Sequence, residues 1–430
     1  MRRRGACHGI IPVQTETYMK LNDEEQHILA GKQGPVPQKA LQHQIKVGDF
    51  FGAADFVPVT QAHIMADTES LGEAGVQWLE SLATEKTGKR RVRIPSITDP
   101  RGTDFAKAAF LRHTQAMLTL EERAIAAFVK LGVLMTNTCI NYQTVQPATR
   151  NEHVAYGDTG VVIYSNSVCG ARSNFEGGPS ALSAGITGRT PRYGFHLPQQ
   201  RMATLHVRVG DTPRTLNEWG ALGGVIGRIA GNYWAVPVIE GIEGSPGSDA
   251  LKHFGAAMAS FGSIALYHLV GLTPEASRLA DVAPNVQQLP THRVTRADFE
   301  TLQKSYHTSD EVDVVVFSAP QLSLLELRDL ADLCEARRFK LPMIAITSPQ
   351  IKPDCDRMGF TETIESAGGQ VLSGMCFYQS YAREMADAHG WKRLATNSAK
   401  LVNILGGYGY QPMLGSMEAC VEAAATGRLV

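Results

Sequence analysis

The sequence predicts an α/β fold with substantial parallel strand pairing. Short apolar runs rich in β-branched residues alternate with helical patterns almost to the end of the chain, and several helical patterns lead directly toward a strand. The strands that we expect are, in order, residues 56–59, 92–95, 133–135, 161–165, 204–209, 234–239, 312–317, 343–347 and 370–372.

Helices fill the gaps between these strands. Capping boxes, in which Asn, Ser or Thr is followed three residues later by Glu, mark three expected helix starts, at residues 22–25, 119–122 and 323–326. The last two open amphipathic helices over 119–131 and 323–338. A longer helix should cover about 248–271.

The length of 430 residues suggests roughly two to three packed units. Residues 273–293 are rich in proline and polar residues, and we expect a soft boundary there. Residues 1–18 precede the first helix start, and we expect them to be a disordered N-terminal extension.

The composition favours small-molecule chemistry over nucleic-acid or membrane binding. Lysine and arginine total 41 against 42 for aspartate and glutamate, so no bulk positive field is present to attract nucleic acid or an anionic membrane. The longest apolar stretches are shorter than the ~20 residues of a membrane-spanning helix. The N-terminus lacks the apolar core of a signal peptide, so we expect a cytoplasmic protein.

One segment, residues 139–178, concentrates chemically useful residues. It contains Cys139 and Cys169, the acid Asp158 beside the hydroxyl of Thr159, and Arg172, together with several glycines that allow a ligand to approach the backbone. Signatures of nucleotide hydrolysis, zinc proteolysis and serine hydrolysis are missing from the sequence. We therefore expect the chemistry in this segment.

Each candidate residue also has a structural interpretation. Cys139 and Cys376, each near an expected strand end, are typical of buried thiols as well as of metal ligands. His63 fits either a satisfied buried histidine or a substrate contact, and Thr68 fits a helix cap slightly better than a ligand contact. Asp158 precedes an expected buried strand, where a carboxylate is costly unless it is paired or used.

Two basic candidates have the same ambiguity. Arg172 and Lys400 suit a carboxylate or phosphate group, or they are ordinary surface charges.

Eight sequence segments together resemble a known family. They are LNDEEQHILAG, AHIMADTESLGEAG, NTCINYQ, IYSNSVCGARSNFEGGPSAL, ITGRTPRYGFHL, the helix start in APQLSLLEL, TNSAK and GSMEACVEAAATG. The chain resembles the large, catalytic part of aconitase X, a branch of the aconitase superfamily also called the phosphomevalonate dehydratase large subunit family. The resemblance covers residue 19 to the C-terminus, with 19–272 as the first part of the catalytic region and 273–430 as its C-terminal α/β part.

The resemblance implies an aconitase-like fold, with multiple mainly parallel sheets flanked by helices and an active site at converging strand ends. It also implies a hydro-lyase that uses an iron-sulfur cluster held by three cysteines. Cys139 and Cys376 stand at two ligand positions, whereas Ala319 stands where the third cysteine is expected. Because a cluster generally needs three or more protein ligands, we expect a cluster smaller than 4Fe-4S or a mononuclear iron, with Cys169 as a compensating ligand.

The motifs and the resemblance together define a predicted site. Its catalytic residues are Asp158, Thr159 and Lys400, its metal ligands are Cys139, Cys376 and Cys169, and its substrate-binding residues are His63, Ala66, Asp67, Thr68, Asp99, Pro100 and Arg172.

The predicted reaction removes water from a β-hydroxy acid, with iron as a Lewis acid on the leaving hydroxyl. The resemblance favours cis-3-hydroxy-L-proline as the substrate and Δ1-pyrroline-2-carboxylate as the product. Mevalonate 5-phosphate dehydration is the alternative, and a noncatalytic binding subunit that has lost its cluster is a third reading. The resemblance also implies a partner, a small swivelling domain that is a separate subunit or a fused domain.

Overall fold

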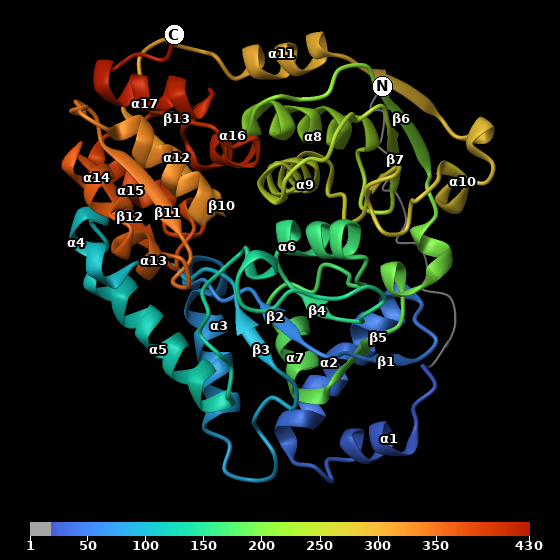
Figure 1. The fold of residues 1–430 in the computed structure, drawn as a ribbon. Coiled ribbons are helices and arrows are strands. Elements are labelled where there is room, and N and C mark those ends of the chain that lie inside the picture. Colours follow the sequence, from blue (N-terminus) through green and yellow to red (C-terminus); the bar gives the residue numbers. More distant parts are fainter. Residues whose placement is uncertain (1–18) are drawn as a thin grey trace, which may run out of the picture.

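The computed structural model describes residues 19–430, so the expected extension over residues 1–18 lies outside the described residues. The described chain forms three regions, each built around its own parallel sheet (Figure 1). The prediction of an α/β fold with several mainly parallel sheets flanked by helices is therefore confirmed.

The first region contains a three-stranded parallel sheet in the order β3-β2-β4 and a separate antiparallel pair, β1 and β5. Helices α2, α3, α5 and α7 pack around the sheet through an apolar cluster that includes Ile64 and Phe128. The elements are α1 Asp23–Leu29, α2 Pro35–Phe51, β1 Phe56–Pro58, β2 Ala62–Ile64, α3 Thr68–Ala83, β3 Ser96–Thr98, α4 Ala108–Leu111, α5 Gln115–Leu131, β4 Ala155–Tyr156, α6 Thr159–Tyr164, α7 Pro179–Thr187 and β5 Arg189–Pro191.

The second region contains a four-stranded parallel sheet in the order β8-β7-β6-β9. Helices α8 and α9 approach each other so closely that a Cβ on Gly223 would lie 2.1 Å from the carbonyl oxygen of Phe254, so only glycine fits there. The elements are β6 Leu205–Val209, α8 Leu216–Ala230, β7 Pro237–Glu240, α9 Ser248–Gly262, β8 His268–Leu269, α10 Leu279–Val282, β9 Thr291–Val294 and α11 Arg296–Ser305. Strand β9, which follows the expected division at residue 272, pairs with β6 of this sheet.

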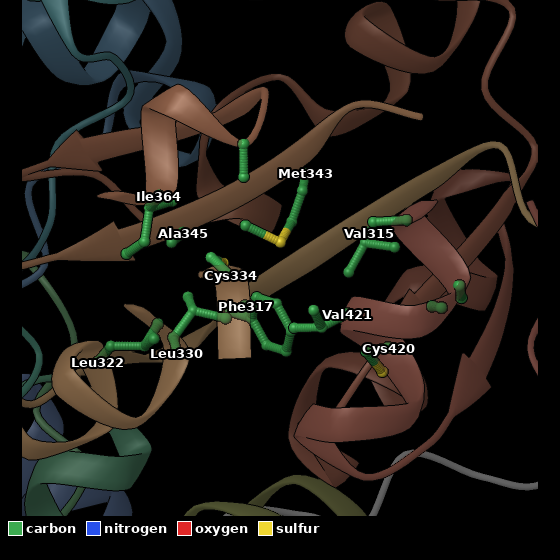
Figure 2. Close-up of a cluster of buried hydrophobic side chains, with 14 of the residues drawn as sticks. Val315, Phe317, Leu322, Leu330, Cys334, Met343, Ala345, Ile364, Cys420 and Val421 are labelled. Carbon is green, nitrogen blue, oxygen red and sulfur yellow. The ribbon is translucent and has the colours of Figure 1, made fainter. Parts of the chain in front are cut away.

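The third region contains a five-stranded parallel sheet in the order β12-β11-β10-β13-β14. Phe317 on β10 is fully buried among Leu330, Met343 and Val421, which come from three other elements (Figure 2). The elements are β10 Val314–Leu322, α12 Leu324–Cys334, β11 Met343–Thr347, α13 Lys352–Arg357, α14 Phe360–Ser366, β12 Gly369–Ser373, α15 Ala382–His389, β13 Arg393–Thr396, α16 Ala399–Leu405, β14 Gln411–Leu414 and α17 Met417–Thr426.

Three of the strand predictions are wrong. Residues 161–165 form helix α6 and the π-helical turn after it, because the Asp158 side chain accepts a hydrogen bond from the Val161 amide and starts a helix. A fully buried apolar run of this length fits a buried helix as well as a buried strand. Residues 92–95 and 133–135 form no strand; β3 begins at Ser96, and Leu134 makes only an isolated bridge to Ile97.

The helix predictions are confirmed in part. Asn22 and Ser323 are N-caps with complete capping boxes. The helix expected at residue 119 begins earlier, at Gln115, because Thr114 caps it. The helix expected over 248–271 ends at Gly262, where Ser263 adopts a left-handed conformation. In the part of the chain that the structure describes, no helix is both long and apolar enough to cross a membrane.

Candidate active site

An ion pair at the N-terminus of α6 forms one side of the site. Asp158 caps this helix, and its Oδ2 atom lies 3.3 Å from the Nζ atom of Lys400 at the start of α16. Both side chains are at most 5% exposed. The Lys400 ammonium also lies 5.6 Å from the ring centroid of Tyr378, within reach of a cation–π interaction.

A second acid group surrounds the Gln379 side chain. Its Nε2 atom donates to Asp99 Oδ2 at 3.1 Å and to Asp67 Oδ2 at 3.3 Å. His63 Nε2 donates to the Thr138 carbonyl at 2.8 Å and lies 3.6 Å from Asp99 Oδ1. His63 Nδ1 and Asp99 Oδ1 are buried without a hydrogen-bond partner, which suits a polar ligand.

Two buried thiols face the Ser318–Gln321 segment of β10. The Ser318 hydroxyl lies 3.8 Å from Cys376 Sγ, and the Gln321 amide donates to Cys139 Sγ at 3.4 Å. The Gln321 side chain links both thiol-bearing loops, because it accepts from the Cys139 amide and donates to the carbonyls of Asn137 and Met375. The bonds to Cys139 and Asn137 join Gln321 to a segment that lies more than 180 residues earlier in the chain.

The environment separates the protonation states of the two central carboxyls. Burial raises the pKa of Asp158, but the Lys400 ammonium and the Val161 amide outweigh burial and hold this pKa below its ordinary value. Burial and the Asp158 charge raise the pKa of Asp99 well above its ordinary value. The environment therefore favours the ionised form of Asp158 and the protonated form of Asp99.

Three other groups of the site are neutral, namely His63, Cys139 and Cys376. Lys400 forms an ion pair with Asp158. Burial lowers the pKa of His63, so its imidazole is neutral. Burial raises the pKa of Cys376 to about 12 and that of Cys139 well above its ordinary value, so both are thiols unless a cation binds them. Burial disfavours the Lys400 ammonium, but the Asp158 carboxylate raises its pKa overall.

The structure places several predicted residues beside this group. Asp67 caps α3, and Thr68, for which we slightly favoured the cap, instead donates to Glu121. Pro100 is buried directly after Asp99, and Thr159 follows Asp158 as the first residue of α6.

Three predicted residues lie elsewhere. Ala66 packs in the apolar core of the first region. The Arg172 guanidinium donates to the His196 carbonyl and to Asn151. Cys169 ends the helical segment that Asp158 starts, about 15 Å away by the helical rise.

The sequence analysis missed three side chains of the site. Gln379 and Tyr378 follow Cys376 within three residues, so their proximity to this thiol was the available signal. Gln321 stood in the segment that departs from the family motif, but nothing in the sequence indicated its contacts with both loops.

Comparisons with known proteins agree with this architecture. Family models for the first, second and third domains of aconitase X match residues 18–199, 203–304 and 312–426. The chain belongs to the aconitase X family. It is a hydro-lyase of this family, in which the similar curated proteins are named dehydratases.

Two relatives and one crystal structure illustrate the range of the family. The phosphomevalonate dehydratase large subunit of Methanothermobacter thermautotrophicus is 33% identical over 90% of this chain and 94% of the relative. Cis-3-hydroxy-L-proline dehydratase of Pseudomonas aeruginosa is 28% identical over 96% of this chain and 71% of the relative. The holo-form aconitase X of Thermococcus kodakaraensis matches with a TM-score of 0.85 and 29% identity, over 94% of this chain and 100% of that chain.

Proposed function

We propose that this aconitase X protein dehydrates cis-3-hydroxy-L-proline to Δ1-pyrroline-2-carboxylate. The charge balance of the site carries the proposal. Lys400 pairs with Asp158, and two further carboxyls, Asp67 and Asp99, accept from Gln379. Hydroxyproline matches this balance, since its carboxylate pairs with Lys400 and its ring ammonium pairs with the ionised Asp158. Mevalonate 5-phosphate carries only negative charges and has no cationic group to pair with Asp158.

The chain's own groups account for the proton transfers of this reaction. Asp158, ionised beside Lys400, accepts the proton from the carbon next to the substrate carboxylate. The carbon–oxygen bond at C3 breaks as the double bond forms, and the leaving hydroxyl takes a proton from Asp99 to depart as water. The resulting enamine rearranges to the imine product. Thr159, directly after Asp158, is proposed as a further polar contact.

We propose that iron is held by Cys139 and Cys376. The aconitase relationship suggests an iron-based cofactor. Among residues 19–430, no group of three or more His, Cys, Asp and Glu side chains is placed to hold a metal ion, which favours a site with fewer than three protein ligands over a four-iron cluster. Two thiols that contact the same β10 segment fit a smaller cluster or a single iron whose other ligands come from elsewhere. When bound, iron supplies Lewis-acid activation of the leaving hydroxyl.

Metal analysis of variants tests the ligands. The protein is purified anaerobically, and iron and acid-labile sulfide are measured in wild type, Cys139→Ser and Cys376→Ser, with Cys169→Ser as the matched control. Both ligand variants should lose iron, and Cys169→Ser should keep it. Iron without sulfide indicates a mononuclear site. Iron loss in Cys169→Ser would instead restore the three-cysteine prediction, and no iron in any preparation would support the noncatalytic alternative.

Mevalonate 5-phosphate dehydration is the second candidate function. Relatives named phosphomevalonate dehydratase large subunit reach 34% identity, and this chain spans 94% of the length of such relatives. A direct comparison decides between the candidates: purified holoenzyme is supplied with each substrate under the same conditions. Turnover of the phosphate ester with no turnover of hydroxyproline would refute the charge argument.

We also propose that a small swivel-domain partner completes the enzyme, within the cytoplasm. Five of the relatives are named large subunits, and the Pseudomonas aeruginosa dehydratase is longer than the part that this chain matches. Activity should therefore rise when the small subunit is added. Equal activity with and without it would refute this part of the proposal.

A further inference from the structure

The reaction groups are enclosed by protein. None of the following side chains is more than 5% exposed: His63, Asp99, Cys139, Asp158, Cys376 and Lys400. A substrate therefore reaches them only after part of the surrounding protein moves.

A cavity borders this enclosed group. It lies between α2, α3 and α7, has a volume of about 600 Å³ and is lined mainly by apolar side chains, with Trp78 on one wall. This volume is in the usual range of small-molecule sites. Asp67 lines the cavity, and the same carboxylate accepts from Gln379, whose amide also donates to Asp99. Asp67 thus separates the cavity from the reaction groups.

The segment that carries Asp67 is joined to the rest of α3 by a break. Residues 68–71 form one helical turn, and Gly72 then adopts φ 58° and ψ −176°, a conformation that is essentially restricted to glycine. No heavy atom lies within 4 Å of the position that a Cβ on Gly72 would occupy. A single unconfined glycine between two rigid parts is a typical hinge.

Two contacts hold this turn against the loop that follows Cys376. The Tyr381 amide donates to Glu69 Oε2 at 2.5 Å, and the Tyr381 hydroxyl lies 2.9 Å from the Thr68 hydroxyl. Tyr381 keeps a left-handed backbone conformation, φ 57°, which is costly for a bulky side chain. The Glu69 contact therefore secures the closed arrangement.

We propose that this cavity is the entry for the substrate and that residues 67–71, turning at Gly72, are the gate that closes it. Only the identity of the substrate, a small carboxylate, rests on the proposed function. Lys39 at the cavity attracts such an anion. In the open state Asp67 moves away from Gln379, and in the closed state it returns and excludes water from the reaction groups.

Thiol accessibility tests the gate without measuring activity. The full chain is purified in chelator, so that the two site thiols are free, and their alkylation by N-ethylmaleimide is followed for each cysteine by mass spectrometry. Glu69→Ala removes the hydrogen bond from the Tyr381 amide, and the Cys139 and Cys376 alkylation rates should rise about tenfold. Glu80→Ala, on α3 beyond the hinge, is the matched control and should change neither rate.

Internal controls and a second variant distinguish the gate from other causes. Cys334 and Cys420 are buried in the core of the third region, so their alkylation reports general unfolding. Ala74→Trp fills the cavity and should slow alkylation of both site thiols several-fold. Unchanged rates in Glu69→Ala, a parallel rise at the core cysteines, or no effect of Ala74→Trp would each overturn the proposal. Iron content and dehydratase activity are measured separately on the wild-type protein, so a failure of the proposed function is distinguishable from a failure of the gate.

Discussion

Replacing Gln321 with alanine should loosen both thiol-bearing loops. The side chain makes three buried hydrogen bonds: it accepts from the Cys139 amide at 3.3 Å and donates to the carbonyls of Asn137 and Met375 at 3.1 Å each. A buried group left without its partner costs about 1–3 kcal/mol, and such costs are not fully additive. We expect the free energy of unfolding to fall by about 3 kcal/mol or more.

Urea unfolding measures this loss, and hydrogen exchange locates it. The Cys139 amide should exchange faster in Gln321→Ala, because it loses its acceptor. The main-chain contact from Lys252 to the Gln321 carbonyl is unaffected by the substitution. Gln350→Ala is a matched control, since Gln350 makes one partly buried bond to the neighbouring Thr136 carbonyl and should cost about 1 kcal/mol. Equal losses in the two variants, with unchanged exchange at Cys139, would refute the linking role of Gln321.

Three further predictions concern buried charges and the core. Burial raises the pKa of Glu326, but Lys252 and His253 outweigh it and lower the pKa from 4.5 to about 2. This carboxylate therefore stabilises the fold by about 3 kcal/mol above pH 4.5, and the stabilisation is lost as pH falls toward 2. Acid titration of Glu326→Gln should not show this loss of stability between pH 4.5 and 2. Burial raises the pKa of Glu176 to about 7, so the free energy of unfolding falls as pH rises from 4.5 to 7. Glu176→Gln should therefore be more stable than wild type above pH 7, by up to about 3 kcal/mol. A less stable variant would contradict this. Phe317→Ala should lower the free energy of unfolding by about 3–5 kcal/mol in urea titration, whereas a loss below about 1 kcal/mol would show that the core collapses into the space.

The fold class was predictable because local patterns carry it. Strand β11 was predicted with its observed limits, since its short apolar run contains β-branched residues and is bounded by Pro342 and Pro349, which favour a strand over a helix. Helix α6 was mistaken for a strand because every residue from Gly160 to Tyr164 is buried, so the run lacks the polar side that reveals a helical period.

The site was predictable where a motif marked it and not elsewhere. Asp158 and Lys400 stood in recognisable motifs, and the structure places them 3.3 Å apart. Gln321 contacts a residue 182 positions away, and such a pairing has no local signal in one sequence. The break at Gly72 was equally hidden, because a glycine inside a helical pattern is consistent with an unbroken helix.

The departure from the family motif and the link between the loops occur in the same segment of β10. Where the resemblance implies a cysteine, the chain has Ala319, and two residues later the Gln321 amide joins the segments of Cys139 and Met375 by hydrogen bonds. A shared metal ligand would join the same segments by coordination. Because hydrogen bonds already hold them, the positions of the thiols depend on Gln321 more than on a third ligand. The absence of a third cysteine is therefore compatible with an ordered site. Ala319 alone does not show that the chain has lost its catalytic activity.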